Sequence, residues 1–169
     1  MSLLTATSDD LKGGRGQPLP DRVWTATVQS AQVVQKDNGS RIEAVLTAFR
    51  DRDGTPEITL PNGATYRPGN RKVFDRQWID HTNPKAAEIG QRYIKKQAMS
   101  AGLMPKPTNW QTVALDFANF TDYAAALVGR DVTVRTKQRQ RQTADGTVAL
   151  DPETQEPIID VEVGDYLVD

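Results

Sequence analysis

The chain has 169 residues, of which 25% are charged and 37% hydrophobic, and it carries a formal net charge of −1 with one histidine and no cysteine. This composition excludes disulfides, thiolate zinc sites and cysteine nucleophiles, and the chain contains no apolar run long enough to cross a bilayer. We therefore expect a soluble protein with no cofactor, no bound metal and no membrane role.

The acidic start MSLLTATSDDLKGG lacks the positive charge and apolar middle of a signal peptide, so we expect the protein in the cytoplasm of its host. Residues 1–20 show no hydrophobic period and are predicted to form a flexible leader. Residues 21–169 are predicted to form a single domain, because a chain of this length can bury a sizeable core without disulfides or a structural metal.

The charges divide the chain into a basic body and an acidic end. All 21 lysines and arginines lie at or before Arg141, and the segment from about residue 143 onward contains eight acidic residues and no base. A basic body favours a polyanionic partner such as nucleic acid, and the acidic segment suggests contacts with replication or recombination proteins. The alternative is a solvated acidic hairpin without a regulatory role. The sequence leaves open whether this end is a strand or a free tail.

Strands are predicted at 23–34 and 41–49, where apolar and polar residues alternate, and they are joined by a turn at 37–39 that contains Asn and Gly. The phase of the first strand shifts near residue 31, which indicates a bulge. A third main strand is predicted at 71–80.

The clearest helix begins at Asn83 and Pro84, which are typical of a helix start, and ends at Gly102. A second, short helix is predicted at 121–128, and strands follow at 131–141 and 158–163. This order predicts a mainly β protein with one or two helices: a five-stranded OB-like barrel with its helix between strands 3 and 4. Periodicity alone also permits another α+β sandwich.

The strand VTVRTKQRQRQ contains the sharpest local signal. Arg135, Lys137, Arg139 and Arg141 fall on one face of it, about 7 Å apart, because strand side chains alternate. This spacing suits the phosphates of an extended single strand of nucleic acid. The alternative is an edge strand that charge protects from aggregation.

A second pattern lies on the third strand, where Lys72, Phe74, Arg76 and Trp78 share one face. Aromatic rings between cations are typical of single-strand binding, since bases stack on the rings and cations neutralise phosphates. The alternative is that Phe74 and Trp78 are core residues. Tyr66, in a loop with Arg71 nearby, is a further candidate for stacking.

Catalytic signals are weak. His81 precedes a helix start, where a polar side chain usually satisfies backbone groups. Asp75 and Asp80 could hold a metal, yet the sequence contains no phosphate-binding loop, nucleophile elbow or zinc-protease motif. We therefore do not expect an enzyme.

The run KVFDRQWIDHTNPKAAEIGQRYIKKQAMSAGL resembles the bacteriophage single-stranded DNA-binding proteins of OB-fold type, a family long known as a phage domain of unknown function. Further similar segments are 126–132 and 161–167, so the resemblance covers roughly residues 20–167. The matching positions are Val73, Phe74, Asn83, Pro84, Ile89, Gly90, Ile94, Ala101, Gly102 and Leu103.

The resemblance implies an OB fold, single-stranded DNA as ligand, and a role in phage DNA replication or recombination. We therefore expect a DNA-binding protein without strict sequence preference. The residues expected to contact DNA are the four cations Arg135, Lys137, Arg139 and Arg141, the third-strand residues Lys72, Phe74, Arg76 and Trp78, and Tyr66 and Arg71. Two alternatives stay open. One is a phage structural or assembly protein that uses its β-barrel for protein contacts, and the other is a nuclease that uses Asp75, Asp80 and His81.

Overall fold

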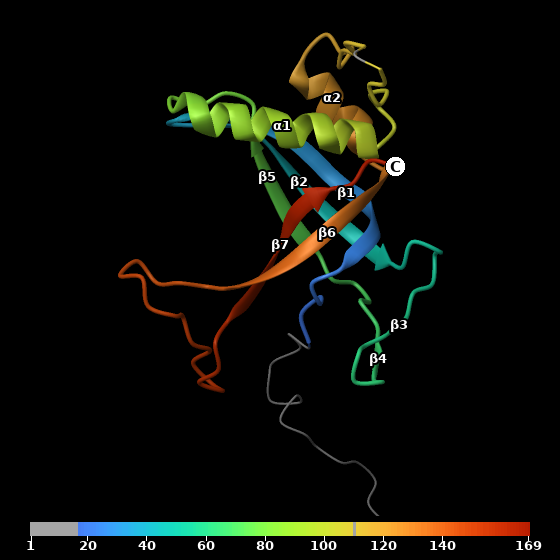
Figure 1. The fold of residues 1–169 in the computed structure, drawn as a ribbon. Coiled ribbons are helices and arrows are strands. Elements are labelled where there is room, and N and C mark those ends of the chain that lie inside the picture. The colour runs from blue at the N-terminus through green and yellow to red at the C-terminus, as the bar shows by residue number, and fades with distance from the viewer. Residues whose placement is uncertain (1–16, 110) are drawn as a thin grey trace, which may run out of the picture.

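The computed structural model describes residues 17–109 and 111–169. It contains a five-stranded antiparallel sheet, a separate two-stranded sheet and two helices (Figure 1). The five strands lie in the order β5-β2-β1-β6-β7. The elements in chain order are β1 (Val23–Lys36), β2 (Gly39–Arg50), β3 (Ile58–Thr59), β4 (Thr65–Tyr66), β5 (Val73–Trp78), α1 (Pro84–Ser100), α2 (Phe120–Leu127), β6 (Asp131–Gln140) and β7 (Ile159–Tyr166).

Alternation of apolar and polar residues determines which side of the sheet is buried. In β1, Trp24, Ala26 and Val28 face the core, as predicted, and the register shifts between Val28 and Ser30, where a bulge was expected. The indole Nε1 of Trp24 donates to the Thr136 Oγ1 at 3.0 Å, so the largest core side chain also links β1 to β6. The inner face of the curved sheet therefore forms one continuous core.

Helix α1 lies across one end of the sheet (Figure 1). Asn83 is its N-cap, and the Asn83 side chain accepts a hydrogen bond from the Lys85 backbone amide, as its sequence position predicts. The helix approaches β5 closely at Gly90, where an added Cβ would lie 2.2 Å from the Trp78 carbonyl oxygen. Only glycine fits this contact, which fixes α1 against the end of β5.

The sheet is not a closed barrel, so the predicted barrel closure is wrong. The edge strands β5 and β7 form no backbone ladder with each other; each pairs on one side only, with β2 and β6 respectively. A ladder requires strands about 4.8 Å apart. Here side chains from both edges lie between the strands, and the Tyr166 hydroxyl donates to the Asp75 Oδ2 across the seam at 2.5 Å.

The predicted helix position also differs from the structure. In chain order α1 follows the fifth strand rather than the third, because β3 and β4 are two additional short strands. These strands pair with each other as a separate hairpin. A second helix, α2, then precedes β6.

The packed domain begins earlier than the predicted boundary at residue 21. Residues 1–16 of the expected leader lie outside the described residues. Leu19, however, is only 1% exposed and belongs to the core. Its carbonyl accepts from the Gln138 Nε2 at 2.8 Å, and the Pro20 carbonyl accepts from the Thr136 Oγ1 at 2.8 Å. Residues 17–20 are therefore part of the folded body.

In the part of the chain that the structure describes, no helix is long and apolar enough to span a membrane.

Candidate nucleic-acid interface

The cations of β6 project outward, as the alternation predicted. Val132, Val134 and Thr136 are buried, whereas the opposite face of the strand is exposed from Arg135 onward. The exposed cations are Arg135, Lys137, Arg139 and, one residue beyond the strand, Arg141. The row of cations is therefore present on the surface.

The acidic end of the chain lies beside this row, in a position that the sequence did not predict. Residues 159–166 form β7, which pairs with β6 so that Asp160 is opposite Arg139 and Glu162 is opposite Lys137. This segment is thus a strand and not a free tail. Asp160 and Glu162 are two residues apart, so they fall on one face of a strand, and this signal could have indicated a strand complementary to the cation row.

Two of the four cations have carboxylate partners. Arg141 bonds both oxygens of Asp160, at 2.6 and 2.9 Å, and the Arg139 Nη1 lies 3.8 Å from the Glu162 Oε2. The hydrogen bond from Arg141 lowers the pKa of the Asp160 carboxyl, so this pair is fully charged at neutral pH. Exposed ion pairs of this kind contribute only about 0.2–1 kcal/mol, so a phosphate can compete for these arginines.

The outer face of β5 carries an exposed aromatic ring between two cations. Phe74 is 62% exposed, and Lys72 and Arg76 on either side of it are also exposed. Phe74 is therefore not a core residue. Among the described residues, Lys72 has no carboxylate within ion-pair distance, while the Arg76 Nε lies 3.6 Å from the Glu43 Oε1.

Trp78, at the end of the same face, is half-buried and already has partners. Its ring lies edge-on to His81, with centroids 4.5 Å apart, and the Arg41 guanidinium carbon lies 5.4 Å from its centroid. Helix α1 also packs against the Trp78 backbone at Gly90, which restricts the position of Trp78. Trp78 is thus less available for base stacking than Phe74.

Tyr66 is misplaced in the sequence-based prediction, since it is a core residue and presents no open ring face. It is 4% exposed, because it pairs with Ile58 in the β3–β4 hairpin and its ring packs near Trp24, with centroids 6.4 Å apart. Its hydroxyl donates to the Gln17 carbonyl at 3.0 Å and accepts from the Arg71 Nε at 2.9 Å. Arg71 therefore binds the Tyr66 hydroxyl, and it also lies at the border of the surface hollow between β5 and β7.

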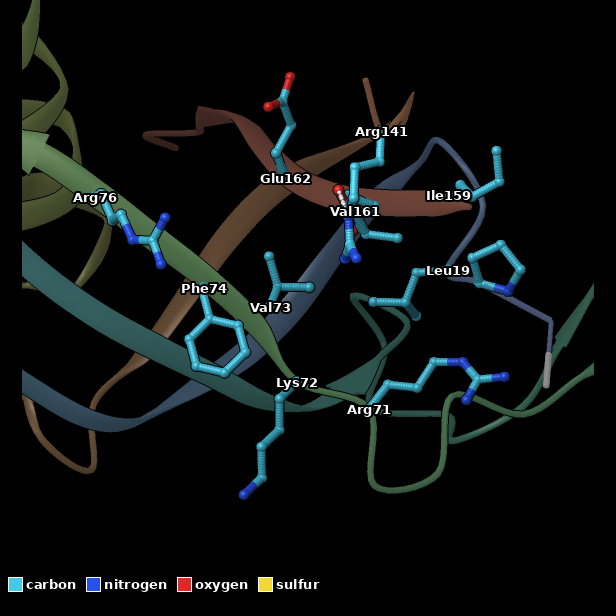
Figure 2. A pocket seen from close by; sticks show the side chains of 12 residues that line it. Leu19, Arg71, Lys72, Val73, Phe74, Arg76, Arg141, Ile159, Val161 and Glu162 are labelled. Atoms are coloured by element: carbon cyan, nitrogen blue, oxygen red, sulfur yellow. Dashed lines mark hydrogen bonds and ion pairs between the residues drawn. The ribbon is translucent and has the colours of Figure 1, made fainter. Parts of the chain in front are cut away.

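A hollow, which we call the seam cleft, separates β5 from β7 (Figure 2). Its larger part has a volume of about 570 Å³ and is bordered by Lys72, Phe74 and Arg76 on one side and by Arg141 and Glu162 on the other. An adjoining part of about 450 Å³ shares Phe74, Arg76 and Glu162 and adds Lys137 and Tyr93. A smaller hollow of about 220 Å³ over β1 and β2 also borders Phe74. Phe74 therefore stands where three hollows meet.

Beneath the seam cleft lies a buried polar network. The Asp75 Oδ1 accepts from the Gln77 Nε2 at 2.7 Å, and its Oδ2 accepts from the Tyr166 hydroxyl. The Gln97 Nε2 donates to the Tyr166 hydroxyl at 2.9 Å, and the Tyr123 hydroxyl donates to the Gln97 Oε1 at 2.9 Å. Burial raises the pKa of the Asp75 carboxyl, against the effect of these hydrogen bonds. The network joins both edges of the sheet to both helices.

The three residues considered for metal-dependent catalysis have separate structural roles. Asp75 faces the interior, while the Asp80 Oδ1 accepts from the Ser40 amide at 2.6 Å and the His81 Nδ1 accepts from the Asn83 amide at 2.9 Å. Across residues 17–109 and 111–169, no three histidine or acidic side chains are grouped so that they could hold a metal ion.

No protein-family model matches this chain, and a search of curated proteins also finds no match. The resemblance to phage single-stranded DNA-binding proteins therefore stays a prediction.

Proposed function

We propose that this protein binds single-stranded DNA without strict sequence preference and acts in phage DNA replication or recombination in the host cytoplasm. The observation that carries the proposal is the exposed Phe74, flanked by Lys72 and Arg76, at the border of the seam cleft. Base stacking on one aromatic ring contributes roughly 1–3 kcal/mol and tolerates any base.

The arrangement of the strands supports the interpretation that the surface around Phe74 corresponds to the binding face of an OB fold. OB folds are partly open five-stranded barrels that bind oligonucleotides on the face of their second and third strands and with the loop between the fourth and fifth strands. In the five-stranded sheet, β2 and β5 are the second and third strands along the chain, and residues 141–158 connect the last two. Phe74 and its neighbouring cations lie on the corresponding face.

The charge of the cleft supports an extended polyanion as its ligand. Lys72 and Arg76 lie about 7 Å to either side of Phe74 along the strand, and Lys137 borders the adjoining hollow. Lys137 has no ion-pair partner among the described residues. A base stacked on Phe74 would thus have cations on both sides for its flanking phosphates.

The test is fluorescence anisotropy of labelled oligo-dT with the full chain at low salt. We expect Phe74→Ala to weaken binding by roughly 5- to 150-fold, the loss of one stacking contact. The matched control is Ile89→Ala, which removes an exposed apolar side chain of α1 outside the cleft and should leave binding unchanged. Flat anisotropy for the unmodified chain would refute the proposal and favour the alternative role in protein contacts or assembly.

A further inference from the structure

The connection between β6 and β7 is an ordered projection. We call residues 142–158 the arm; in Figure 1 it extends from the sheet, away from the helices and the remaining strands. The arm is held by its own backbone bonds. Gln142 bridges Val148 and Leu150 bridges Pro157, and the Ala149 amide donates to the Arg141 carbonyl at 2.7 Å. The arm is therefore a shaped surface and not merely a linker.

The arm presents apolar side chains that its own fold does not cover. Val148 is 39% exposed and Leu150 is 47% exposed, and they belong to the few large apolar residues of the described chain that are exposed to this degree. The arm also contains four acidic residues and no base, including the exposed Glu153. Apolar contacts surrounded by negative charge suit a partner surface that is apolar and positive.

The seam cleft has these complementary properties. Phe74 is the most exposed large apolar residue in the described part of the chain, and Lys72, Arg76 and Lys137 surround it. The surface that best matches the arm is thus on the chain itself.

One molecule is not built to bring its arm into its own cleft. The stem of the arm borders the cleft at Arg141 and Ile159 and leads away from it (Figures 1 and 2). That direction is held by the bond from the Arg141 amide to the Ile158 carbonyl at 2.9 Å and by the two bonds from Arg141 to Asp160. Return of the arm to the same cleft would require the stem to reverse and these bonds to break.

We propose that the arm of one copy docks in the seam cleft of a second copy, with Val148 and Leu150 against Phe74 and with Glu153 near the cations of β5. The contact joins two different surfaces, so it is head-to-tail and can continue from copy to copy. It does not require the cleft to bind nucleic acid.

The test is sedimentation velocity of the full chain over a range of concentrations, with two surface variants. The arm variant carries Val148→Thr, Leu150→Ser and Glu153→Gln, and the cleft variant carries Phe74→Ser and Lys72→Gln. We expect the unmodified chain to associate with increasing concentration, more weakly at high salt, and each variant alone to associate at least roughly tenfold more weakly.

Mixing the two variants gives the decisive measurement. The arm variant retains an intact cleft and the cleft variant retains an intact arm, so an equimolar mixture should form dimers and nothing larger. A monomeric unmodified chain, a cleft variant that still associates by itself, or a mixture that stays monomeric would each overturn the proposal. Should either variant melt early, the single replacements Leu150→Ser and Phe74→Ser take their place in the same design.

Addition of oligo-dT separates this proposal from the proposed function. If both hold, the oligonucleotide displaces the arm and the assemblies dissociate. If the chain associates through the arm and cleft but binds no oligo-dT, the self-association stands and the DNA-binding proposal fails. If the chain binds oligo-dT but stays monomeric at all concentrations, the DNA-binding proposal stands and the self-association proposal fails.

Discussion

Strands β5 and β6 carry similar alternating cations, yet their surfaces differ. On β5 the cations flank an exposed ring: Lys72 has no carboxylate within ion-pair distance in the described chain, and the Arg76 Nε lies 3.6 Å from the Glu43 Oε1. On β6 no aromatic residue interrupts the row, and its outer end faces the acids of β7, so that Arg139 and Arg141 are engaged by Glu162 and Asp160. The same sequence pattern thus produces different surfaces, because the neighbouring strand decides whether a cation is available.

The largest expected effect comes from breaking the connection between the two sides of the seam. Asp75→Ala removes the acceptor for the Tyr166 hydroxyl and the Gln77 amide. Each buried polar group left without a partner costs about 1–3 kcal/mol, so we expect the free energy of unfolding to fall by about 3 kcal/mol or more. Urea denaturation measures this loss. Asp116→Ala, at an exposed position, is the control and should stay within about 0.5 kcal/mol.

The next effect compares the cations of β5 and β6 directly. Lys72→Gln with Arg76→Gln should reduce the salt dependence of oligo-dT binding by about 0.7 to 1.5 units of log K per log salt. Each phosphate contact on a single strand contributes about 0.7, and the lower value applies if Glu43 keeps Arg76 engaged. Arg139→Gln with Arg141→Gln should reduce it by less than half as much, because these arginines exchange a carboxylate for a phosphate. Anisotropy titrations at several salt concentrations measure both slopes. Equal slopes for the two double variants would contradict the distinction drawn between the strands.

Removal of the β7 carboxylates should have a smaller effect and should increase, not decrease, the affinity for oligo-dT. Asp160→Asn with Glu162→Gln releases Arg139 and Arg141, so binding of oligo-dT at low salt should strengthen by a few-fold, within the modest energies of exposed ion pairs. The gain should disappear when Arg139 and Arg141 are also replaced by glutamine. If the acid variant binds no more tightly than the unmodified chain, the strand β7 does not restrain these arginines.

The smallest expected effect concerns pH. Burial raises the pKa of Asp75 in the folded state, although hydrogen bonds from Tyr166 and Gln77 oppose this shift. A raised pKa means that folding favours the protonated carboxyl, so its contribution to stability is present below the unfolded pKa of about 3.9 and decreases as pH rises through the folded pKa. The stability of the unmodified chain relative to Asp75→Asn should therefore decrease as pH rises from about 3.5 upward. Urea denaturation of both proteins at each pH measures this difference in the free energy of unfolding. A difference that does not change with pH would contradict the predicted pKa shift of Asp75.

Local patterns predicted those parts of the structure that depend on neighbouring residues. The alternation in β6 placed Val134 inside, and the Asn83-Pro84 pair marked the start of α1. The alternation in β5 grouped Phe74 with Lys72 and Arg76 but left open whether its ring is core or exposed. These features depend on strand geometry and helix capping, which a few adjacent residues determine.

Features that depend on distant segments were not predictable in the same way. Tyr66 is buried because it contacts Gln17 and Trp24, and no local pattern around Tyr66 indicates these partners. The pairing of Arg141 with Asp160 depends on the register between β6 and β7. Barrel closure depends on how far the sheet curls, which the strand sequences do not determine individually.

The side-chain contact across the seam has a mechanical consequence. Side chains and not a ladder span the gap between β5 and β7: Tyr166 donates to Asp75, and Gln97 of α1 donates to both of them. Separation of the two edges would break these side-chain bonds but no backbone pair of the sheet. The seam is therefore the one edge of the sheet that can widen without loss of a strand pair, and α1 limits how far it opens, because Gln97 binds side chains from both strands.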